Sequence, residues 1–285
     1  MKNHTGYFEG RERRKLFYQN WMPDSGDNKA FIIGIHGWGT HSDRFKVPAE
    51  YLTEKGYALY SFDLRGHWRN AGNTPGHIDS MDHIQKDIVL FMDIVRKDSK
   101  DKKIFLLGHS LGGLISLIYA INRPDLPGVI VTSPMLGLSI GKKLAKSIAK
   151  SISSKLTPTK IMNYEIDQAI LTSDLKILRS YIADDNKLNI ISVKTAAERQ
   201  KSMIWAMDNV KYLSCPVLIM QAGNDKVIDK EKTKEFFEKV KSKDKTYKEY
   251  DGFLHDILHE KKRAQVYRDI DIFISKILGI KINNF

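Results

Sequence analysis

Cysteine is nearly absent from the chain, which has a single one, Cys215, among 285 residues. A single cysteine excludes an intramolecular disulfide and is typical of a protein that works in a reducing compartment such as the cytosol. Cys215 stands just before Pro216 and an apolar segment. We therefore expect it to pack in the interior and not to act as a reactive thiol.

Long apolar runs are also missing. The first fifteen residues are polar and charged, and they lack the apolar stretch of a secretory signal peptide. No apolar run reaches the roughly 18 residues that a membrane-spanning helix needs. The hydrophobic content of 42% is ordinary for a soluble globular chain. Together these features predict a cytoplasmic protein.

Negative charge is in deficit, and the formal net charge is +12. Such an excess of positive charge can attract nucleic acid, anionic lipid or an acidic substrate, or it can simply belong to a lysine-rich surface. The sequence shows no nucleic-acid-binding module and no interleaving of basic with aromatic residues. We therefore expect no nucleic-acid partner.

The most informative segment runs from Ile104 to Leu114. Its first four residues are apolar and predict a buried strand, and the apolar pattern that follows predicts a helix up to Asn122. Between them lies Gly108-His-Ser-Leu-Gly112, the G-x-S-x-G pattern of a nucleophile elbow in the strand–turn–helix context that the motif requires. The segment therefore predicts that Ser110 projects its hydroxyl above a sheet, at the N-terminus of a helix.

Apolar strand-like runs alternate with helical patterns along most of the chain. This alternation predicts a mostly parallel sheet with helices on its faces. Before it begins, residues 7–23 predict an antiparallel hairpin with a charged tip. The predicted strands cover 30–36, 57–63, 104–107, 128–132, 217–221 and 246–250, and the predicted helices cover 42–56, 81–98, 113–122, 228–241 and 257–278.

The alternation stops at Ser133-Pro134 and resumes at Val217. Between about 138 and 213 the sequence shows helical patterns and no clear strand. We therefore predict an α/β core of residues 1–134 and 214–285, and an inserted helical cap of residues 135–213 after the sixth strand.

An amphipathic helix is predicted inside this insert, over residues 140–156. Isoleucine, leucine and alanine cover one half of the helical wheel. Lysines cluster on the other half, at Lys142, Lys143, Lys146 and Lys150. The pattern fits a cap helix with solvated lysines, and it also fits a helix that meets an anionic membrane surface. Residues 137–213 hold 13 Lys and Arg against 7 Asp and Glu, so half of the net charge lies in the insert.

A serine hydroxyl is a good nucleophile only when a base takes its proton, and the base needs a third group that orients it. In folds that carry the elbow, these partners follow the serine in the order acid, then histidine, each in a loop after a strand. Asp225 follows the strand that ends at 221, and His255 follows the strand that ends at 250. We therefore predict Ser110, Asp225 and His255 as the catalytic set.

Each partner has a rival nearby. Asp229 is the alternative acid, but it directly precedes a predicted helix and suits an N-cap better. His259 is the alternative base, but its position one turn into the predicted last helix favours a surface residue.

The oxyanion of an acyl-transfer intermediate needs two backbone N–H donors. Leu111, directly after the nucleophile, is the first expected donor. Trp38, in the glycine-flanked loop after the strand 30–36, is the second, whether or not its side chain also packs in the core.

Several motifs together resemble the α/β-hydrolase family of monoacylglycerol lipases and lysophospholipases, which is serine aminopeptidase-like. They are His36-Gly-Trp-Gly-Thr-His-Ser-Asp-Arg-Phe45, Asp63-Leu-Arg-Gly-His67, Gly108-His-Ser-Leu-Gly-Gly113, Ser133-Pro134, Gly223-Asn-Asp225 and His255-Asp-Ile-Leu-His-Glu260. The resemblance covers nearly the whole chain. It carries the family's catalytic positions to Ser110, Asp225 and His255, and its oxyanion positions to Trp38 and Leu111.

The resemblance implies an eight-stranded sheet, a helical cap over the site, and hydrolysis of acyl esters without a cofactor or metal. The expected substrate is a monoacyl lipid or another small acyl ester. One alternative is an aminopeptidase of the same fold, which would need cap carboxylates that hold a free amine, and another is a binding protein without activity. The candidate carboxylates are Glu165, Asp167, Asp174, Asp184 and Asp185.

Overall fold

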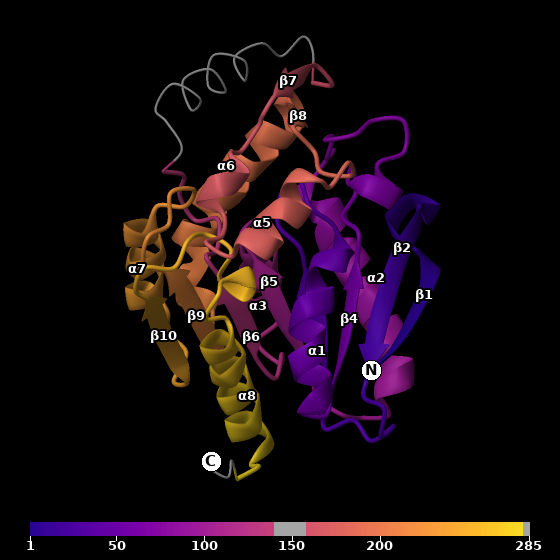
Figure 1. Cartoon of the computed structure of the whole chain (residues 1–285), viewed down its shortest axis with the longest axis vertical. Helices are drawn as coiled ribbons and strands as arrows, with labels where there is room; N and C mark the ends of the chain where they lie inside the picture. The colour runs from indigo at the N-terminus through magenta and orange to yellow at the C-terminus, as the bar shows by residue number, and fades with distance from the viewer. Residues whose placement is uncertain (140–157, 282–285) are drawn as a thin grey trace.

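The structure, a computed structural model, describes residues 1–139 and 158–281. Its centre is an eight-stranded sheet (Figure 1). The strands are β1 (Lys2–Glu9), β2 (Lys15–Met22), β3 (Ala30–Ile35), β4 (Tyr57–Phe62), β5 (Ile104–His109), β6 (Val129–Thr132), β9 (Val217–Ala222) and β10 (Lys245–Tyr250). Their spatial order is β1-β2-β4-β3-β5-β6-β9-β10. The strands from β4 to β10 in this order run parallel, and β1 and β2 form an antiparallel edge.

Helices cover both faces of the sheet. They are α1 (Lys46–Glu54), α2 (Met81–Ser99), α3 (Leu111–Ile121), α7 (Lys230–Lys239) and α8 (Ala264–Leu278). In Figure 1, α1 and α8 lie in front of the sheet and α2 and α3 lie behind it. Alternate residues of β3 serve the two faces, since Phe31 and Ile33 pack with α2 and α3 whereas Ala30 and Ile32 pack with α1 and α8.

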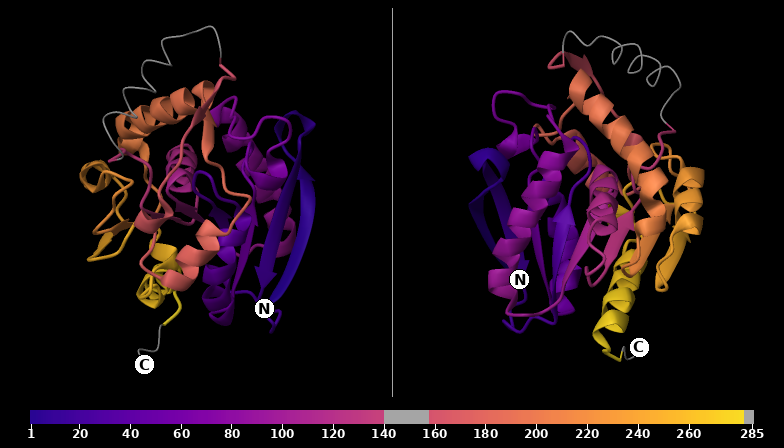
Figure 2. Two further views of the ribbon diagram at one scale, coloured as in Figure 1. Left: turned by 45° about the horizontal axis from the view of Figure 1, so that its top comes forward. Right: turned by 180° about the vertical axis from the view of Figure 1, so that it is seen from behind.

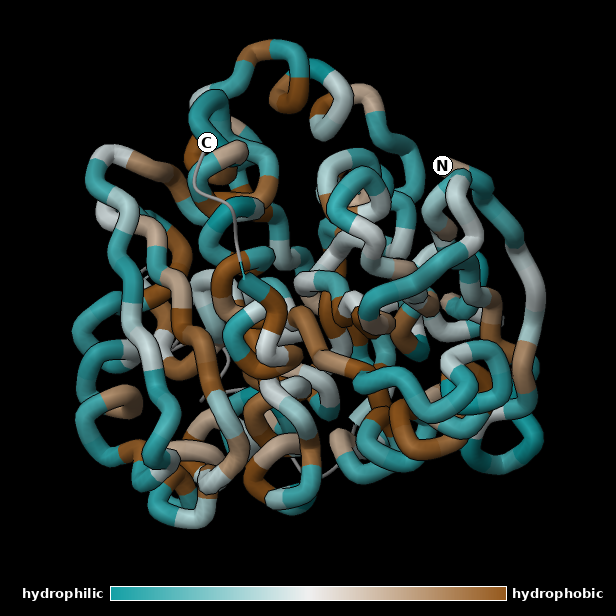
Figure 3. The backbone as a smooth tube through the Cα atoms, turned by 90° about the horizontal axis from the view of Figure 1, so that it is seen from below, coloured by the Kyte–Doolittle hydropathy of each residue, from teal (hydrophilic) through white to brown (hydrophobic). Residues whose placement is uncertain are grey.

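This double coverage explains the apolar strands. A parallel strand between two helical layers is buried on both faces, so its sequence is a continuous apolar run and not an alternation. All six residues of β3 and all six of β4 are buried. The tube in Figure 3, seen from below, shows hydrophobic segments inside the layers and hydrophilic segments on the outer turns. The predicted mostly parallel α/β architecture is confirmed.

The predicted last helix over 257–278 is wrong as a single element. The chain instead forms a short 3-10 helix, η6 (Ile257–His259), a turn, and then α8. Both pieces are apolar on their inner side, so their residues together imitate one helical stripe.

The insert between β6 and β9 adds no strand to the main sheet within the described residues. Its described elements are β7 (Ile161–Asn163), α5 (Leu175–Ile182), β8 (Ile190–Ser192) and α6 (Val193–Asn209), which gather at one end of the sheet (Figures 1 and 2). β7 and β8 pair as an antiparallel ribbon, so the prediction of no strand in this region is wrong. Each has only three residues, too few to give a strand pattern in the sequence. The predicted lysine-faced helix over 140–156 lies outside the described residues.

Backbone hydrogen bonds join the insert to loops of the core. Leu188 N donates to Gly39 O at 3.0 Å, and Ser192 N donates to Gly76 O at 3.0 Å. From the core side, Asp256 N donates to Leu171 O at 2.8 Å. The insert is therefore bonded to the loops after β3, β4 and β10.

Two predictions can be compared with the structure: that no helix is apolar and long enough to span a membrane, and that the single cysteine packs in the interior. No helix in the described ranges combines the length and apolar character that crossing a membrane requires. Cys215 is buried, and burial raises the pKa of its thiol to about 12, so the prediction of a packing residue is confirmed.

Candidate active site

The predicted nucleophile lies at a strained turn between β5 and α3. Ser110 has φ 53° and ψ −114°, a backbone conformation that side-chain-bearing residues rarely adopt. Three backbone hydrogen bonds hold it there. Ser110 N donates to Thr132 O at 2.9 Å, and Ser110 O accepts from Leu114 N at 3.1 Å and from Met135 N at 2.9 Å. The strain is thus balanced by the surrounding backbone, as expected where strain serves a function.

The two glycines of the motif are required by close packing. A Cβ atom at Gly108 would collide with the Gly112 carbonyl, and a Cβ at Gly112 would collide with the carbonyl of Ile35 on the neighbouring strand. Both glycines therefore allow the strand and the helix to approach closely around the turn. Leu111 is the first residue of α3, so its N–H has no partner inside the helix.

The predicted base and acid are in direct contact. His255 Nδ1 lies 2.9 Å from Asp225 Oδ2 and 3.1 Å from Oδ1. A carboxylate can only accept, so Nδ1 must carry a proton, and in the neutral ring Nε2 is then the unprotonated nitrogen. This is the tautomer that a general base needs.

The Asp225 carboxylate is fixed by further donors. Its Oδ1 accepts from Val227 N at 2.8 Å and Ile228 N at 2.9 Å, and its Oδ2 accepts from Gln221 Nε2 at 3.0 Å. Burial alone would raise the pKa of Asp225, but its contact with His255 and the backbone hydrogen bonds outweigh burial and lower it. The group therefore stays ionised and orients the imidazole.

The structure separates the two rivals. Asp229 is the N-cap of α7, where its side chain accepts from Glu231 N at 3.1 Å, so its predicted capping role is confirmed. The prediction that His259 lies on the surface is wrong. His259 is buried, and its Nδ1 lies 3.0 Å from Asp256 Oδ1. The turn between η6 and α8, which the sequence did not reveal, folds this residue inward.

One pocket unites the predicted residues. Trp38, Ser110 and His255 all line it, together with Tyr164 and Tyr181 from the insert. The glycine loop, residues 36–39 after β3, runs along the nucleophile, since a Cβ at position 37 would lie 3.3 Å from the Cβ of Ser110.

Two predicted residues do not line the pocket themselves. Asp225 lies behind His255, and Leu111 follows the nucleophile in the chain. Trp38 is 6% exposed, so its side chain also packs in the core, as the sequence allowed.

A buried histidine shapes the glycine loop. His36 Nδ1 donates to Gly37 O at 2.8 Å, and Nε2 accepts from Leu64 N at 2.8 Å. Burial lowers the pKa of His36 well below its ordinary value, so the ring is neutral and each nitrogen has the role that its partner demands. Sequence reasoning assigned no role to this residue, although its place directly after a buried strand marks it as part of the loop.

A second buried carboxylate, Asp256, adjoins the base and also lines the pocket. It accepts a 2.6 Å hydrogen bond from the hydroxyl of Tyr181 in the insert and contacts His259. His109 of the elbow has its Nε2 4.0 Å from Asp256 Oδ1. No local pattern predicted this cluster, because its members come from distant parts of the chain.

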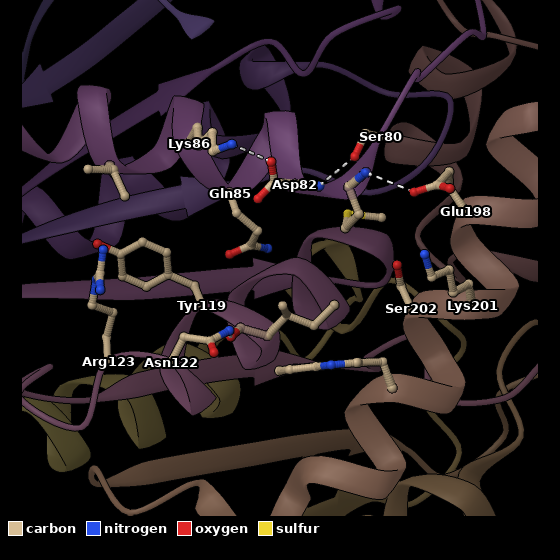
Figure 4. A pocket seen from close by; sticks show the side chains of 14 residues that line it. Ser80, Asp82, Gln85, Lys86, Tyr119, Asn122, Arg123, Glu198, Lys201 and Ser202 are labelled. Atoms are coloured by element: carbon tan, nitrogen blue, oxygen red, sulfur yellow. Dashed lines mark hydrogen bonds and ion pairs between the residues drawn. The ribbon is translucent and has the colours of Figure 1, made fainter.

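A larger hollow, of about 510 Å³, lies between α2, α3 and α6 (Figure 4). Its polar groups largely bind one another. Asp82 pairs with Lys86 at 2.6 Å, Ser80 caps α2, and Glu198 accepts from the N–H of Met81 at 3.2 Å. None of the predicted catalytic residues lines it, so size alone does not locate the active site.

The fold and the elbow define the class: the chain is an α/β-hydrolase. The family model described as serine aminopeptidase, S33, matches residues 26–262, and the chain belongs to this family.

Several relatives share most of the chain. It is 29% identical to phospholipase YtpA of Bacillus subtilis over 252 residues, which cover 87% of this chain and 96% of the relative. It is 26% identical to human monoglyceride lipase over 276 residues, 92% of this chain and 87% of the relative. The crystal structure of Paleococcus ferrophilus monoacylglycerol lipase superposes with a TM-score of 0.81 at 28% identity, covering 92% and 99% of the two chains. These matches agree with the predicted family.

Proposed function

We propose that this protein is a serine hydrolase that cleaves acyl esters, with Ser110 as nucleophile, His255 as general base and Asp225 as the acid that orients the base. The observation that carries the proposal is one pocket lined both by the strained serine and by a histidine whose Nδ1 is held by a buried carboxylate. A serine activated in this way attacks acyl carbonyls.

The reaction proceeds in two halves. His255 Nε2 takes the proton of the Ser110 hydroxyl as its oxygen bonds to the ester carbonyl carbon, and the carbonyl oxygen becomes an oxyanion. The backbone N–H groups of Trp38 and Leu111 stabilise this oxyanion. The C–O bond to the alcohol then breaks, and the alcohol leaves with the proton from His255. Water, deprotonated by the same imidazole, hydrolyses the acyl-enzyme and releases the acid.

The substrate that the pocket and the relatives favour is a monoacyl lipid. Two relatives carry the names phospholipase and monoacylglycerol lipase, and both names denote enzymes of lipids. The lining includes apolar side chains that suit an acyl chain, at Met135, Ile166, Leu171 and Val227.

Aminopeptidase activity is the second candidate, since the family description names it. A free amine in the site would need a carboxylate partner. Among the described residues, the pocket lining includes none of the five predicted cap carboxylates. The one carboxylate in the lining, Asp256, already accepts from Tyr181 and His259. These contacts favour ester hydrolysis.

Residues 135–213 are proposed to act as a cap that approaches lipid aggregates. Half of the large exposed hydrophobic residues in the described ranges belong to it, namely Ile161, Leu175, Ile182, Ile204 and Tyr212. The charge excess of the insert suits an anionic surface. Changing the four lysines at 142, 143, 146 and 150 to Gln should weaken co-sedimentation with anionic vesicles, by about 1 kcal/mol per lysine, and less at high salt. Equal binding by wild type and variant would exclude a membrane role for these lysines.

The test of the function combines labelling with turnover. A fluorophosphonate probe should label wild type and not Ser110→Ala. A series of p-nitrophenyl esters of increasing chain length should be hydrolysed, and an amino-acid anilide should not. The Ser110→Ala variant should lose on the order of 10⁴-fold in kcat while it keeps its fold. Unchanged turnover in this variant would refute the assignment of the nucleophile.

A further inference from the structure

Asp256 is a buried carboxylate that the proposed reaction does not use. It directly follows His255 and is 7% exposed. A buried charge is costly unless hydrogen bonds satisfy it. The Tyr181 hydroxyl donates to Oδ2 at 2.6 Å, and His259 Nδ1 donates to Oδ1 at 3.0 Å. Burial alone would raise the pKa of Asp256, but His259 and the hydrogen bonds outweigh it and hold the pKa well below the ordinary carboxyl value. The group is therefore an anion at neutral pH.

This negative charge lines the same pocket as the base. His109 connects the two, since its Nε2 is 4.0 Å from Asp256 Oδ1 and its ring centroid is 4.9 Å from that of His255. Burial lowers the pKa of His109 to about 4, so this ring is neutral at pH 7 and adds no positive charge of its own. When His255 takes the serine proton, the resulting imidazolium thus shares its pocket with an anion other than Asp225.

The insert supplies the hydroxyl that holds this anion. Tyr181 belongs to α5 and is buried, and burial raises its pKa well above the ordinary value, so the hydroxyl remains a donor. The guanidinium of Arg44, from the core, lies 3.5 Å from the centroid of the Tyr181 ring. Arg44 also pairs with Asp184 of the insert at 3.3 Å. The tyrosine is therefore fixed by both parts of the chain.

We propose that Tyr181 and Asp256 are positioning residues: the insert, through Tyr181, holds a buried carboxylate whose charge stabilises the protonated form of His255. The inference rests on the proposed function, because it assumes that His255 is the base. The titratable and charged groups around this pair, beside Asp225 and the base itself, are His109 on β5, Arg44 before α1, His259 on η6 and Tyr267 on α8.

The proposal predicts opposite changes for two variants. Asp256→Asn removes the negative charge, so the imidazolium is less stable and the base loses its proton at lower pH. Tyr181→Phe keeps the charge and removes one of its two hydrogen bonds, so the anion acts more strongly on the base and the proton is lost at higher pH. By the effect of a nearby charge, the shift in Asp256→Asn should be about 0.5 to 1 pH unit, and the shift in Tyr181→Phe, which changes no charge, should be smaller. A purely structural role would lower activity or stability without opposite shifts.

The experiment measures the rate of Ser110 labelling by a fluorophosphonate between about pH 5 and 9, where histidine titrates. The midpoint of the rate profile is compared among wild type, Asp256→Asn and Tyr181→Phe. Tyr267→Phe is the matched control, because it also removes a buried tyrosine hydroxyl that bonds the same segment, at Leu258 O, two residues after Asp256. Its midpoint should equal that of wild type.

The outcomes separate the two proposals. Absence of labelling in wild type would overturn the proposed function. Labelling with wild-type midpoints in both variants, or with shifts in the same direction, would overturn only the positioning role. Should Asp256→Asn fail to fold, the positioning role is tested by Tyr181→Phe alone. Its midpoint should shift toward higher pH while the midpoint of Tyr267→Phe stays equal to that of wild type.

Discussion

Replacing Asp225 by Asn should disable the base through its tautomer. In the structure, Oδ1 accepts from two backbone N–H groups, those of Val227 and Ile228, whereas Oδ2 accepts from Gln221 Nε2 and is the oxygen nearer to His255 Nδ1, at 2.9 Å against 3.1 Å. Backbone donors cannot reverse, so the asparagine must place its oxygen at the Oδ1 position and its NH₂ at the Oδ2 position. That NH₂ donates to His255 Nδ1, which must then be unprotonated. The proton moves to Nε2, where it blocks general-base catalysis.

The expected loss in kcat is about 10⁴-fold, or about 5.5 kcal/mol of transition-state stabilisation. The assay is the turnover of a short soluble ester near pH 7, with the melting temperature as a check of the fold. Asp229→Asn is the matched control, since Asn caps a helix about as well as Asp and Asp229 is the cap of α7. Asp229→Asn should retain wild-type turnover. A loss in kcat smaller than about tenfold in Asp225→Asn, or a loss in kcat larger than about tenfold in Asp229→Asn, would refute the reasoning.

Three further predictions concern stability. Gly112→Ala should lower the soluble yield or the melting temperature strongly, because its Cβ would collide with the Ile35 carbonyl, and an unchanged melting temperature would contradict the packing argument. Arg199→Met should leave the melting temperature equal or higher, whereas Arg65→Met should lower it, with a loss of about 3 to 5 kcal/mol in the free energy of unfolding. The reason is that Arg199 is buried with no carboxylate within 4.0 Å among the described residues, while Arg65 pairs with buried Asp87. Similar losses of stability in the two variants would contradict this reasoning. Acid should destabilise the fold, because the pKa values of Asp225 and Asp256 are lower in the folded state than in the unfolded state. The stability that these two carboxylates contribute is present above the ordinary carboxyl pKa and is lost as the pH falls through their folded pKa values. A melting temperature that does not change below about pH 4 would contradict this prediction.

The main sheet could be predicted because its strands leave a strong signal. Parallel strands covered on both faces are uninterrupted apolar runs, such as 30–35 and 217–220, and the helices between them show apolar stripes. The ribbon of β7 and β8 left no such signal, since three-residue strands fixed by pairing have no pattern of their own. The break between η6 and α8 was missed because it lies within a continuous apolar periodicity.

The part of the candidate site that could be predicted is the part that follows from the order of motifs along the chain. The elbow locates the serine, and the loops after β9 and β10 locate Asp225 and His255, so their contact required no knowledge of side-chain packing. The partnership of Tyr181 with Asp256 could not be found in this way. The two residues lie 75 positions apart, and only the folding of the insert onto the loop after β10 joins them.

The contacts of the insert bear on how a substrate can enter. Leu171 O binds the backbone of the loop that carries His255, and Leu188 N binds the loop that carries Trp38. Thr172 Oγ1 also donates to His259 O at 2.9 Å. A swing of the whole insert away from the core would break these bonds, and with them the support of both the base and the proposed oxyanion donor. Entry that leaves residues 171–172 and 188 in place keeps the base and the oxyanion loop aligned while the pocket fills.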